Sequence, residues 1–543
     1  MTRAALRCAA PALVLAAAVL LPFLGKAFTI DDTMFLRQAE HLLSDPLHPT
    51  AFEMVWSSAA SPVRNSAIMP SGPVMAYLLV PCVRLGGTEW VAHLTHLLLF
   101  GFAILATAGL ALRLGLDRAG ARAASLLLAA TPAALAMAGT AMPDIPAMAF
   151  GVVGMERLFA WRDGHRWQQG VSAALAFALS ALARPYLILL LGIAALALPG
   201  DFLTRRSWQE TRRTAWLPLV AAPLLVVAAL FATHDPAASP ISMASAAGTF
   251  SSPYFIPRNI VAFATHWTLV MPLALPWAVL RWRALLRQPF LYIVTITVGF
   301  LLLAGGKSHI LLTGGNPHLA LLIAPAAGVG AGVLWDVLGE GWRRRDAIQI
   351  VLGLSLLIAL PVVIYMHMPS KYLLASAPTA SILVGRALAA RSRTFSRAIL
   401  GATVVAGIVL GLLILRADAA FSELGRRAAN ELIAPQVAAG RNVWFAGHWG
   451  FQWYAEKAGA RCLTMTPPLP LPGDLAVSSL NSIGHAINLF PKRKLLATME
   501  DSTPGGRIMD KSLGSGFYSN PWGYLPWAWG DDVLDRFSLW QLE

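Results

Sequence analysis

Two acidic segments are the first candidates for chemistry in this chain. Asp31 and Asp32 are adjacent and follow the first apolar run, and Asp144 lies in the segment AMPDIPA (141–147) between two later apolar runs. Acidic residues contribute little to membrane orientation and are costly to bury near lipid, so topology does not require them there. Simpler explanations stay open, namely a solvated helix start at the first pair and a capped turn at Asp144.

Basic and aromatic residues stand at further ends of apolar runs. Arg184 interrupts the run SALARPY (180–186), where a guanidinium must pair or reach the membrane surface, and phosphate is a natural partner for it. The other members of this set are Lys307, His309, His318, Lys371 and Tyr372. Each one alone is more simply explained as an anchor at the membrane surface. Together with the carboxylates they predict a cationic, acid-bearing cavity that opens to one side of a membrane.

The composition is typical of a membrane protein. Of 543 residues, 57% are apolar and 13% are charged, too few charges to cover a soluble chain of this length. The net charge of +14 would suit nucleic-acid binding, but the arginines and lysines occur in short clusters between apolar runs. That placement is typical of membrane topology and argues against a nucleic-acid partner.

The apolar runs predict a polytopic α-helical membrane protein with about thirteen transmembrane helices. The first helix is expected over roughly residues 8–29, and a shorter run over 74–85 is expected to be re-entrant or interfacial. The later spans are expected near 89–112, 123–141, 145–160, 169–183, 185–200, 215–232, 267–280, 289–304, 318–338, 348–366, 372–389 and 398–415.

The distribution of arginine predicts the orientation. Arginine clusters occupy every second loop, as in 343–345 and 391–397, while the intervening loops hold isolated basic residues. The positive-inside rule then places the N-terminus in the cytoplasm and the carboxylates on the outer face. We expect the first run to be an uncleaved helix, with a cleaved signal peptide as the alternative.

The composition changes near residue 416. Residues 1–415 are predicted to form the transmembrane domain, with an outer loop over 30–72 that contains a helix suited to the membrane surface from Asp32 to Leu43. Residues 416–543 are predicted to form a small extracytoplasmic α/β domain. Strands are expected over 442–446, 460–464 and 475–479, and a helix over 451–458. The tryptophans of the tail are expected to pack in the core and not to stack on sugars.

No motif for a competing chemistry is present in the sequence. We find no P-loop, Rossmann glycine fingerprint, HExxH or GxSxG segment. His448, in the turn GHWG (447–450), is interpreted as structural. The three cysteines, Cys8, Cys82 and Cys462, show neither a pairing pattern nor metal-ligand spacing.

The order of the segments resembles the GT-C superfamily of membrane glycosyltransferases, in particular its bacterial branch of aminoarabinose lipid A transferases and protein O-mannosyltransferases. The segment DDTMF (31–35) is similar to that family's Asp-Glu-x-x-Tyr motif, and PSGPVMAYLL (70–79) to its Pro-Pro-Leu-x-Tyr segment. MPDIPA (142–147) resembles the second acidic motif, and KYLL (371–374) the later Arg-Tyr-Leu-x-Pro segment. The likeness covers about residues 8–415. It departs from the family where Arg184 replaces the usual Lys.

This resemblance implies a glycosyltransferase that moves a sugar from a polyprenyl-phosphate donor to a lipid, glycan or protein acceptor on the extracytoplasmic face. The donor phosphate would meet Arg184, Lys307 or Lys371. The resemblance implies inversion at the anomeric carbon, no cofactor and no catalytic metal. The polar groups on the outer face and the compact chain favour a bacterial inner membrane as the location.

The resemblance also implies roles for the acidic residues. Asp31 would act as the general base or orient the acceptor hydroxyl, with Asp144 supporting the same site. The first catalytic position is open between Asp31 and Asp32, and the alignment favours Asp31. The implied substrate-binding residues are Tyr372, His318 and His309.

A transporter or flippase of lipid-linked sugars is the alternative from another class. Transporters usually place polar residues near mid-membrane, on broken helices in repeated halves, whereas here they gather at helix ends and no halves repeat. A structural or assembly protein would leave the outer carboxylates unexplained.

Overall fold

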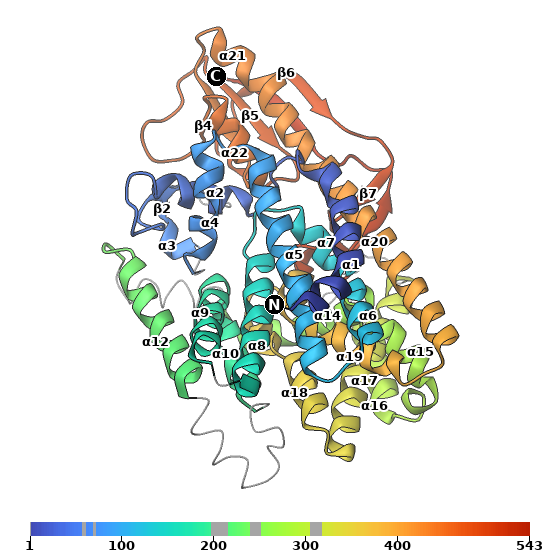
Figure 1. The fold of residues 1–543 in the computed structure, drawn as a ribbon. Coiled ribbons are helices and arrows are strands. Elements are labelled where there is room, and N and C mark those ends of the chain that lie inside the picture. Colours follow the sequence, from blue (N-terminus) through green and yellow to red (C-terminus); the bar gives the residue numbers. More distant parts are fainter. Residues whose placement is uncertain are drawn as a thin grey trace.

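The computed structural model describes residues 2–56, 61–68, 72–164, 166–196, 216–238, 251–304 and 318–543. Most of these residues are helical, and a mixed β-sheet from the C-terminal part lies at one end of the helical region (Figure 1). The helices of the helical region include α1 (Arg3–Leu20), α5 (Glu89–Arg113), α6 (Arg118–Ala129), α7 (Pro132–Ala138), α8 (Asp144–Gly164), α9 (Trp167–Ala183), α10 (Ile188–Ala195), α12 (Trp216–Thr233), α14 (Ile256–Leu269), α15 (Ala274–Leu285), α16 (Pro289–Ala304), α17 (His318–Arg344), α18 (Ala347–Ser355), α19 (Ala377–Ala389) and α20 (Arg393–Ala428).

The helices include several that can span a membrane. Within the described ranges, six helical segments are long and apolar enough, or up to eight if each bent pair counts as one span. The six are Arg3–Phe23, Glu89–Arg113, His318–Arg344, Ala347–Ile364, Ser370–Ala389 and Arg393–Ala438. Shorter apolar helices cover Val74–Arg84, Pro185–Ala195, Pro218–Thr233 and Pro289–Leu303. A polytopic membrane protein is thus confirmed, and the number of about thirteen helices is not.

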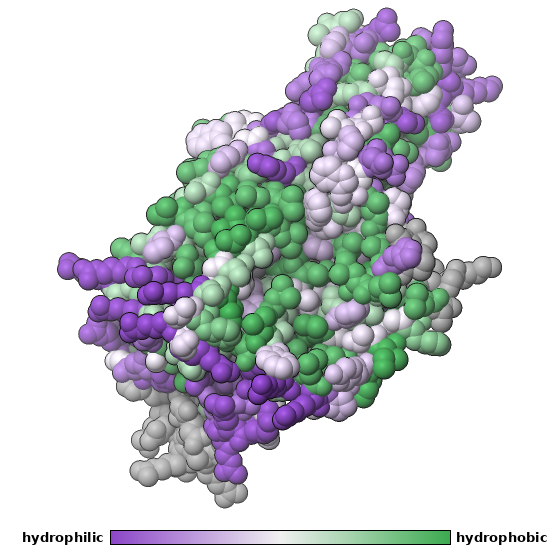
Figure 2. All heavy atoms as spheres, turned by 90° about the vertical axis from the view of Figure 1, so that its right-hand side faces the viewer, coloured by the Kyte–Doolittle hydropathy of each residue, from purple (hydrophilic) through white to green (hydrophobic). Residues whose placement is uncertain are grey.

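The surface has the distribution of polarity that a membrane requires. Figure 2 shows hydrophobic side chains over the middle of one face, with hydrophilic ones below them and on the upper lobe. On α20, for example, Val405 and Val409 are 62% and 52% exposed. Apolar side chains that are exposed in the chain itself are stable when the solvent is lipid.

Two membrane segments are bent. The α6–α7 pair turns by 57° at Pro132, which cannot continue the hydrogen-bond ladder of α6, and the α14–α15 pair turns by 92°. α20 crosses close to the first bend, where a Cβ on Gly407 would lie 2.1 Å from the Ala130 carbonyl oxygen. Only glycine permits this approach, which fixes α20 against the segment that leads to Asp144.

The helix predicted to begin at Asp32 is present as α2 (Asp32–His41), but it is enclosed and does not lie flat on a membrane. It packs against α4 (Val74–Arg84) and α22 (Trp449–Lys457). Phe35, Leu36 and Ala39 are buried in this contact. The apolar face that suited a lipid surface is therefore covered by the chain itself.

The C-terminal part contains the strands and the helix expected from the sequence. The sheet has the order β4-β3-β5-β11-β6, in which β3 is parallel to β4 and β5, and β11 is antiparallel to β5 and β6. These strands are β3 (Val443–Ala446), β4 (Arg461–Cys462), β5 (Leu475–Ser479), β6 (Arg493–Glu500) and β11 (Arg536–Leu542). Phe451 of α22 packs on Phe445 and Phe537 of one sheet face.

Short elements complete the fold. Two-stranded pairs are formed by β1 (Glu53–Met54) with β2 (Val63–Arg64), β7 (Gly505–Arg507) with β10 (Ala528–Gly530), and β8 (Met509–Asp510) with β9 (Ser515–Gly516), and the short helices are α3 (Asn65–Ile68) and α21 (Ala434–Ala438). α20 passes residue 416 without a break. The domain boundary predicted there stays a prediction.

Candidate active site

The adjacent carboxylates Asp31 and Asp32 have different surroundings. Asp32 is fully buried, and its two oxygens accept the backbone N–H groups of Thr29 at 2.9 Å and Ala141 at 2.8 Å. The Asp31 side chain is 24% exposed and accepts a hydrogen bond from Lys371 Nζ at 3.0 Å. Asp32 therefore joins the start of α2 to the turn before Asp144, while Asp31 faces the other candidate residues.

The same surroundings shift the acidity of the two groups in opposite directions. Burial raises the pKa of Asp32 to about 7, although the Lys26 ammonium acts in the opposite direction. Burial also acts to raise the pKa of Asp31, but the Lys371 ammonium outweighs it and holds the pKa below its usual value. Asp31 is consequently the carboxylate that is ionised throughout the neutral range.

We expect Asp32→Asn to change how stability depends on pH. An unfolded aspartate titrates near 4, whereas folded Asp32 keeps its proton up to about pH 7. Between these values the folded state binds more protons than the unfolded state, so the free energy of unfolding decreases as the pH rises and levels off above pH 7. The variant lacks this contribution. Its Tm in detergent between pH 4.5 and 8 should fall less steeply than that of the wild type, and equal slopes would contradict the assignment.

Asp144 and Arg184 form a buried ion pair beside Asp31. Asp144 is the first residue of α8, and Arg184 follows the last residue of α9. Arg184 Nε donates to Asp144 Oδ1 at 3.1 Å and one terminal nitrogen to Oδ2 at 2.8 Å, a two-pronged contact. The guanidinium also lies 5.0 Å from the centroid of the Tyr372 ring, and Tyr186 donates its hydroxyl to the Tyr372 carbonyl oxygen at 2.9 Å.

Lys371 and Tyr372 lie on a 3-10 helix, Ser370–Ser376, that leads into α19. The Lys371 side chain is 3% exposed, and its ammonium lies 3.4 Å from Met142 Sδ and 5.8 Å from the centroid of the Tyr518 ring. The Tyr372 hydroxyl lies 3.4 Å from His367 Nε2. Burial, followed by the Lys371 charge, lowers the pKa of His367 to about 3, so this imidazole is neutral at physiological pH.

A C-terminal segment holds this 3-10 helix in place. The Phe517 carbonyl oxygen accepts the Ser370 hydroxyl at 3.1 Å, and Asn520 Oδ1 accepts the Met368 N–H at 2.8 Å. Asn520 Nδ2 in turn donates to Asn259 Oδ1 on α14 at 2.9 Å. The position of Lys371 is therefore set jointly by the helical region and by residues near the C-terminus.

A second buried ion pair lies behind Asp32. Lys26 Nζ donates to Asp418 Oδ2 at 2.8 Å, and the two side chains are 1% and 2% exposed. Asp418 also accepts the Thr29 hydroxyl and the Tyr518 hydroxyl, each at 2.8 Å. α20, the loop after α1 and the C-terminal segment thus meet at one carboxylate.

Arg258 on α14 is a further cation near the site and is not one of the residues predicted from the sequence. Its guanidinium is half-buried, donates to the Met366 carbonyl oxygen and lies 5.2 Å from the centroid of the Phe255 ring. Its Nε is buried without a hydrogen-bond partner, and no described carboxylate forms an ion pair with the side chain. The only signal in the sequence is that Arg258 is one of the few basic residues in loops predicted to face outward.

The structure thus brings together Asp31, Asp144, Arg184, Lys371 and Tyr372, five residues selected from four separate motifs. His318 begins α17, where its side chain is exposed. Lys307 and His309 lie outside the described residues, so their predicted roles stay predictions. Within the described ranges, no group of three or more His, Cys, Asp or Glu side chains is arranged to hold a metal ion.

His448, predicted from the sequence to be structural, lies in the C-terminal part. It is buried at the turn before α22, and its Nδ1 lies 2.9 Å from Gln452 Oε1. This local contact is consistent with that interpretation.

This arrangement of helices is the fold of the GT-C membrane glycosyltransferases, as the sequence resemblance predicted. The oligosaccharyltransferase of Archaeoglobus fulgidus, in its complex with Zn and sulfate, matches with a TM-score of 0.50 and 12% identity over 84% of this chain and 62% of that chain. ArnT from Cupriavidus metallidurans bound to undecaprenyl phosphate matches with a TM-score of 0.45 and 18% identity over 91% of this chain and 96% of that chain. The arabinofuranosyltransferase AftD from Mycobacteria matches with a TM-score of 0.45 and 14% identity over 100% of this chain and 40% of that chain.

The match with a TM-score of 0.50 establishes the fold alone, and at 12% identity it carries over neither a substrate nor residue roles. No family model matches the chain, and no curated protein matches its sequence.

Proposed function

We propose that this chain is a glycosyltransferase that moves a sugar from a polyprenyl-phosphate donor to an acceptor on the extracytoplasmic face of the membrane. The observation that best supports the proposal is the contact between Asp31, an ionised and partly exposed carboxylate, and the buried Lys371 ammonium at 3.0 Å. A base for the acceptor and a cation for the donor phosphate then stand side by side on a GT-C fold.

Asp31 is proposed to act on the acceptor hydroxyl. The acceptor oxygen forms a bond to the anomeric carbon while the bond from that carbon to the phosphate oxygen breaks, and the hydroxyl proton passes to the Asp31 carboxylate. The polyprenyl phosphate leaves with the bonding electron pair. A single displacement of this kind inverts the anomeric carbon, and the carboxylate also stabilises positive charge on the sugar ring.

Asp144 is proposed to be a positioning residue. Both of its oxygens accept hydrogen bonds from Arg184, so it is engaged as a partner of that guanidinium. Arg184 in turn contacts the Tyr372 ring, beside Lys371. The ion pair thereby fixes the wall next to Asp31 and leaves Asp31 as the carboxylate available to the acceptor.

Arg258 and Lys371 are proposed to bind the donor phosphate. Arg184 and Lys371 have carboxylate partners, whereas Arg258 has none among the described residues. The charges of Lys371 and Arg258 both lower the pKa of His367, so the two cations lie near the same imidazole. An anion between them would supply the negative charge that Arg258 lacks.

We expect Arg258→Gln to raise the KM for the donor by roughly 10–100-fold, because a hydrogen bond to a charged group contributes about 1.5–3 kcal/mol. The measurement is initial transfer rate against donor concentration in detergent micelles. Arg441→Gln, which removes an exposed arginine of the C-terminal part, is the matched control and should leave the KM unchanged. An unchanged KM in Arg258→Gln would exclude this residue from the donor site.

The transferase activity itself is tested in membranes that contain the chain and in matched membranes without it. A panel of polyprenyl-phosphate donors, radiolabelled in the sugar, is added, and we expect label from at least one to reach a product that lacks the polyprenyl chain. If no donor is consumed while labelled lipid crosses the bilayer faster with the chain present, the alternative of a flippase replaces this proposal.

A further inference from the structure

A polar cavity lies at the end of α20 farthest from the candidate active site. Asp418 of α20 contacts the loop that carries Asp31, whereas Arg393 is the first residue of the same helix. The helix between Asp418 and Arg393 is about 37 Å long at 1.5 Å per residue. This length is close to the thickness of a bilayer with its interfacial regions, about 40 Å. The cavity therefore lies at the opposite membrane surface.

Three arginines surround this cavity. It has a volume of about 580 Å³ and lies between the first turns of α6, the end of α19 and the start of α20. Arg391, Arg393 and Arg397 line it, together with small residues such as Gly120 and Gly385. A Cβ on Gly385 would lie 2.8 Å from the Gly120 carbonyl oxygen, so this close contact of α6 with α19 shapes the floor of the cavity.

The positive charge of the cavity is not balanced by the described residues. Arg393 and Arg397 form no ion pair there, and Arg391 donates to the Leu280 carbonyl oxygen at 3.0 Å. The lining carboxylate, Asp117, instead accepts the backbone N–H of Gly120 at 2.7 Å as the N-cap of α6.

Two arginines of neighbouring helices at this end, Arg281 and Arg386, have carboxylate partners. Arg281 bonds to Asp336, and Arg386 bonds to Asp346. Arg391, Arg393 and Arg397 differ from these two arginines in having no carboxylate partner among the described residues, and they line one cavity together. Three guanidinium groups around one cavity suit an anion.

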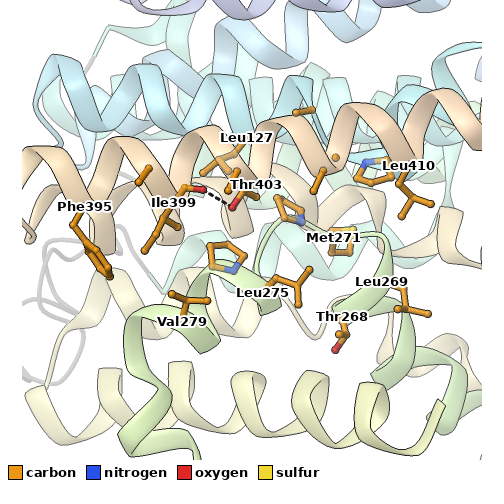
Figure 3. Close-up of a pocket in the computed structure, with 18 residues that line it drawn as sticks. Leu127, Thr268, Leu269, Met271, Leu275, Val279, Phe395, Ile399, Thr403 and Leu410 are labelled. Atoms are coloured by element: carbon orange, nitrogen blue, oxygen red, sulfur yellow. Dashed lines mark hydrogen bonds between the residues drawn. The ribbon is translucent and has the colours of Figure 1, made fainter. Parts of the chain in front are cut away.

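An apolar cleft begins next to the arginines. It has a volume of about 490 Å³ and lies between α20, the bend from α14 to α15, and α6 (Figure 3). It follows α20 from Phe395 to Leu410, about 22 Å of helix. The Thr403 hydroxyl donates to the Ile399 carbonyl oxygen at 2.8 Å, so it needs no partner from the cleft (Figure 3). Such a lining suits a hydrocarbon chain and not water.

We propose that the arginine cavity and the cleft together bind an anionic phospholipid. Its phosphate lies at Arg393 and Arg397, and one acyl chain enters the cleft past Phe395. Basic pockets between membrane helices are suited to anionic headgroups. The cleft is long enough for one acyl chain, since a leaflet of the hydrocarbon core is about 15 Å thick. The hydrogen bond from Arg391 to the Leu280 carbonyl oxygen joins the connection between α19 and α20 to α15, next to Val279 of the cleft.

The test measures the Tm of the full-length, delipidated protein in a neutral detergent. Phosphatidylglycerol is titrated, with phosphatidylcholine of the same acyl chains, inorganic phosphate and a polyprenyl phosphate as the other arms. We expect phosphatidylglycerol to raise the Tm more than phosphatidylcholine or inorganic phosphate does. An equal response to phosphatidylcholine would overturn the proposal, and so would full protection by inorganic phosphate alone, which would indicate an anion site without a lipid.

Variants separate the cavity from general charge effects. Arg393→Gln/Arg397→Gln should raise the half-saturating phosphatidylglycerol concentration at least about tenfold. Arg283→Gln/Arg287→Gln removes the same charge at the same end but outside the cavity, and should behave as the wild type. Equal effects of the two double substitutions would overturn the proposal.

A third variant tests the cleft. Ala402 is an exposed small residue in its lining, and Ala402→Phe fills the space without changing the charge. This substitution should weaken the response to phosphatidylglycerol. If it weakens only the response to polyprenyl phosphate, the cleft belongs to a donor tail and the proposal fails. Asp31→Asn should keep the phosphatidylglycerol response, so failure of the transferase proposal leaves this test intact.

Discussion

Replacing Asp31 with asparagine is expected to lower the rate of sugar transfer by about 10²–10⁴-fold, the usual contribution of a general base. Asparagine keeps the shape of the side chain but does not take up the acceptor proton. Because Lys371 holds the pKa of Asp31 below its usual value, this carboxylate does not titrate between pH 5 and 8. The wild-type rate should therefore show no loss from Asp31 protonation until the pH falls below that range.

The substitution also leaves the Lys371 ammonium, 3% exposed, without its carboxylate, so a loss of stability must be separated from a loss of chemistry. Asp31→Asn/Lys371→Gln removes both charges and should recover Tm without recovering transfer. Asp45→Asn removes a carboxylate from the same loop and should keep full activity. Transfer by Asp31→Asn at the wild-type rate would show that the base is a different group.

The apolar runs predicted most helices of the described membrane region but not their bends. The run expected as one helix over 123–141 is α6 and α7, broken before Pro132, and the run over 267–280 covers the end of α14 and the start of α15. Hydropathy averaged over a window detects the length and the polarity of an apolar run. One proline barely changes this average, so the bend that it causes is not detected. Pro132 and Pro272 lie at the two bends, but a proline alone does not show that a helix bends there. The helices that pack against the bend decide this, and they are known only from the structure.

The sequence indicated which residues are candidates for the site, but it did not indicate which of them contact one another. Asp31, Asp144 and Lys371 were selected because charged groups are rare at the ends of membrane helices. Their partners are distant in sequence, as in the contact of Arg184 with Asp144 and that of Lys371 with Asp31. Helix packing determines which cation pairs with which carboxylate, and a single sequence does not show how the helices pack.

The C-terminal part contributes to the site in a way that a division near residue 416 did not anticipate. Tyr518 lies over Lys371 and donates to Asp418, and Asn520 fixes the backbone at Met368. In the sequence, Tyr518 and Asn520 belong to a polar and aromatic C-terminal segment with no motif that indicates a role in the site. Only the structure shows that they contact Lys371 and the backbone at Met368, at the start of the 3-10 helix.

Breaking the buried pair between Lys26 and Asp418 is expected to lower the free energy of unfolding by about 3–5 kcal/mol, because an unpaired charge is left in a site closed to water. The two side chains are 1% and 2% exposed, and Asp418 accepts three hydrogen bonds from side chains. Asp418→Asn removes the ion-pair partner of Lys26, whose other hydrogen bond goes to the Ala27 carbonyl oxygen at 3.3 Å. The measurement is thermal and denaturant unfolding of the purified protein in detergent.

Arg427 and Glu431 supply the matched comparison within the same helical segment. This ion pair has a distance of 3.1 Å, but its side chains are 50% and 54% exposed. Water and salt screen such a pair, so Arg427→Gln should cost less than about 1 kcal/mol. If Asp418→Asn and Arg427→Gln lower the free energy of unfolding by the same small amount, the Lys26–Asp418 pair is hydrated and does not hold α20 to the loop that carries Asp31. A much larger loss for Asp418→Asn would mean that the buried pair stabilises the contact of α20 with the loop that carries Asp31.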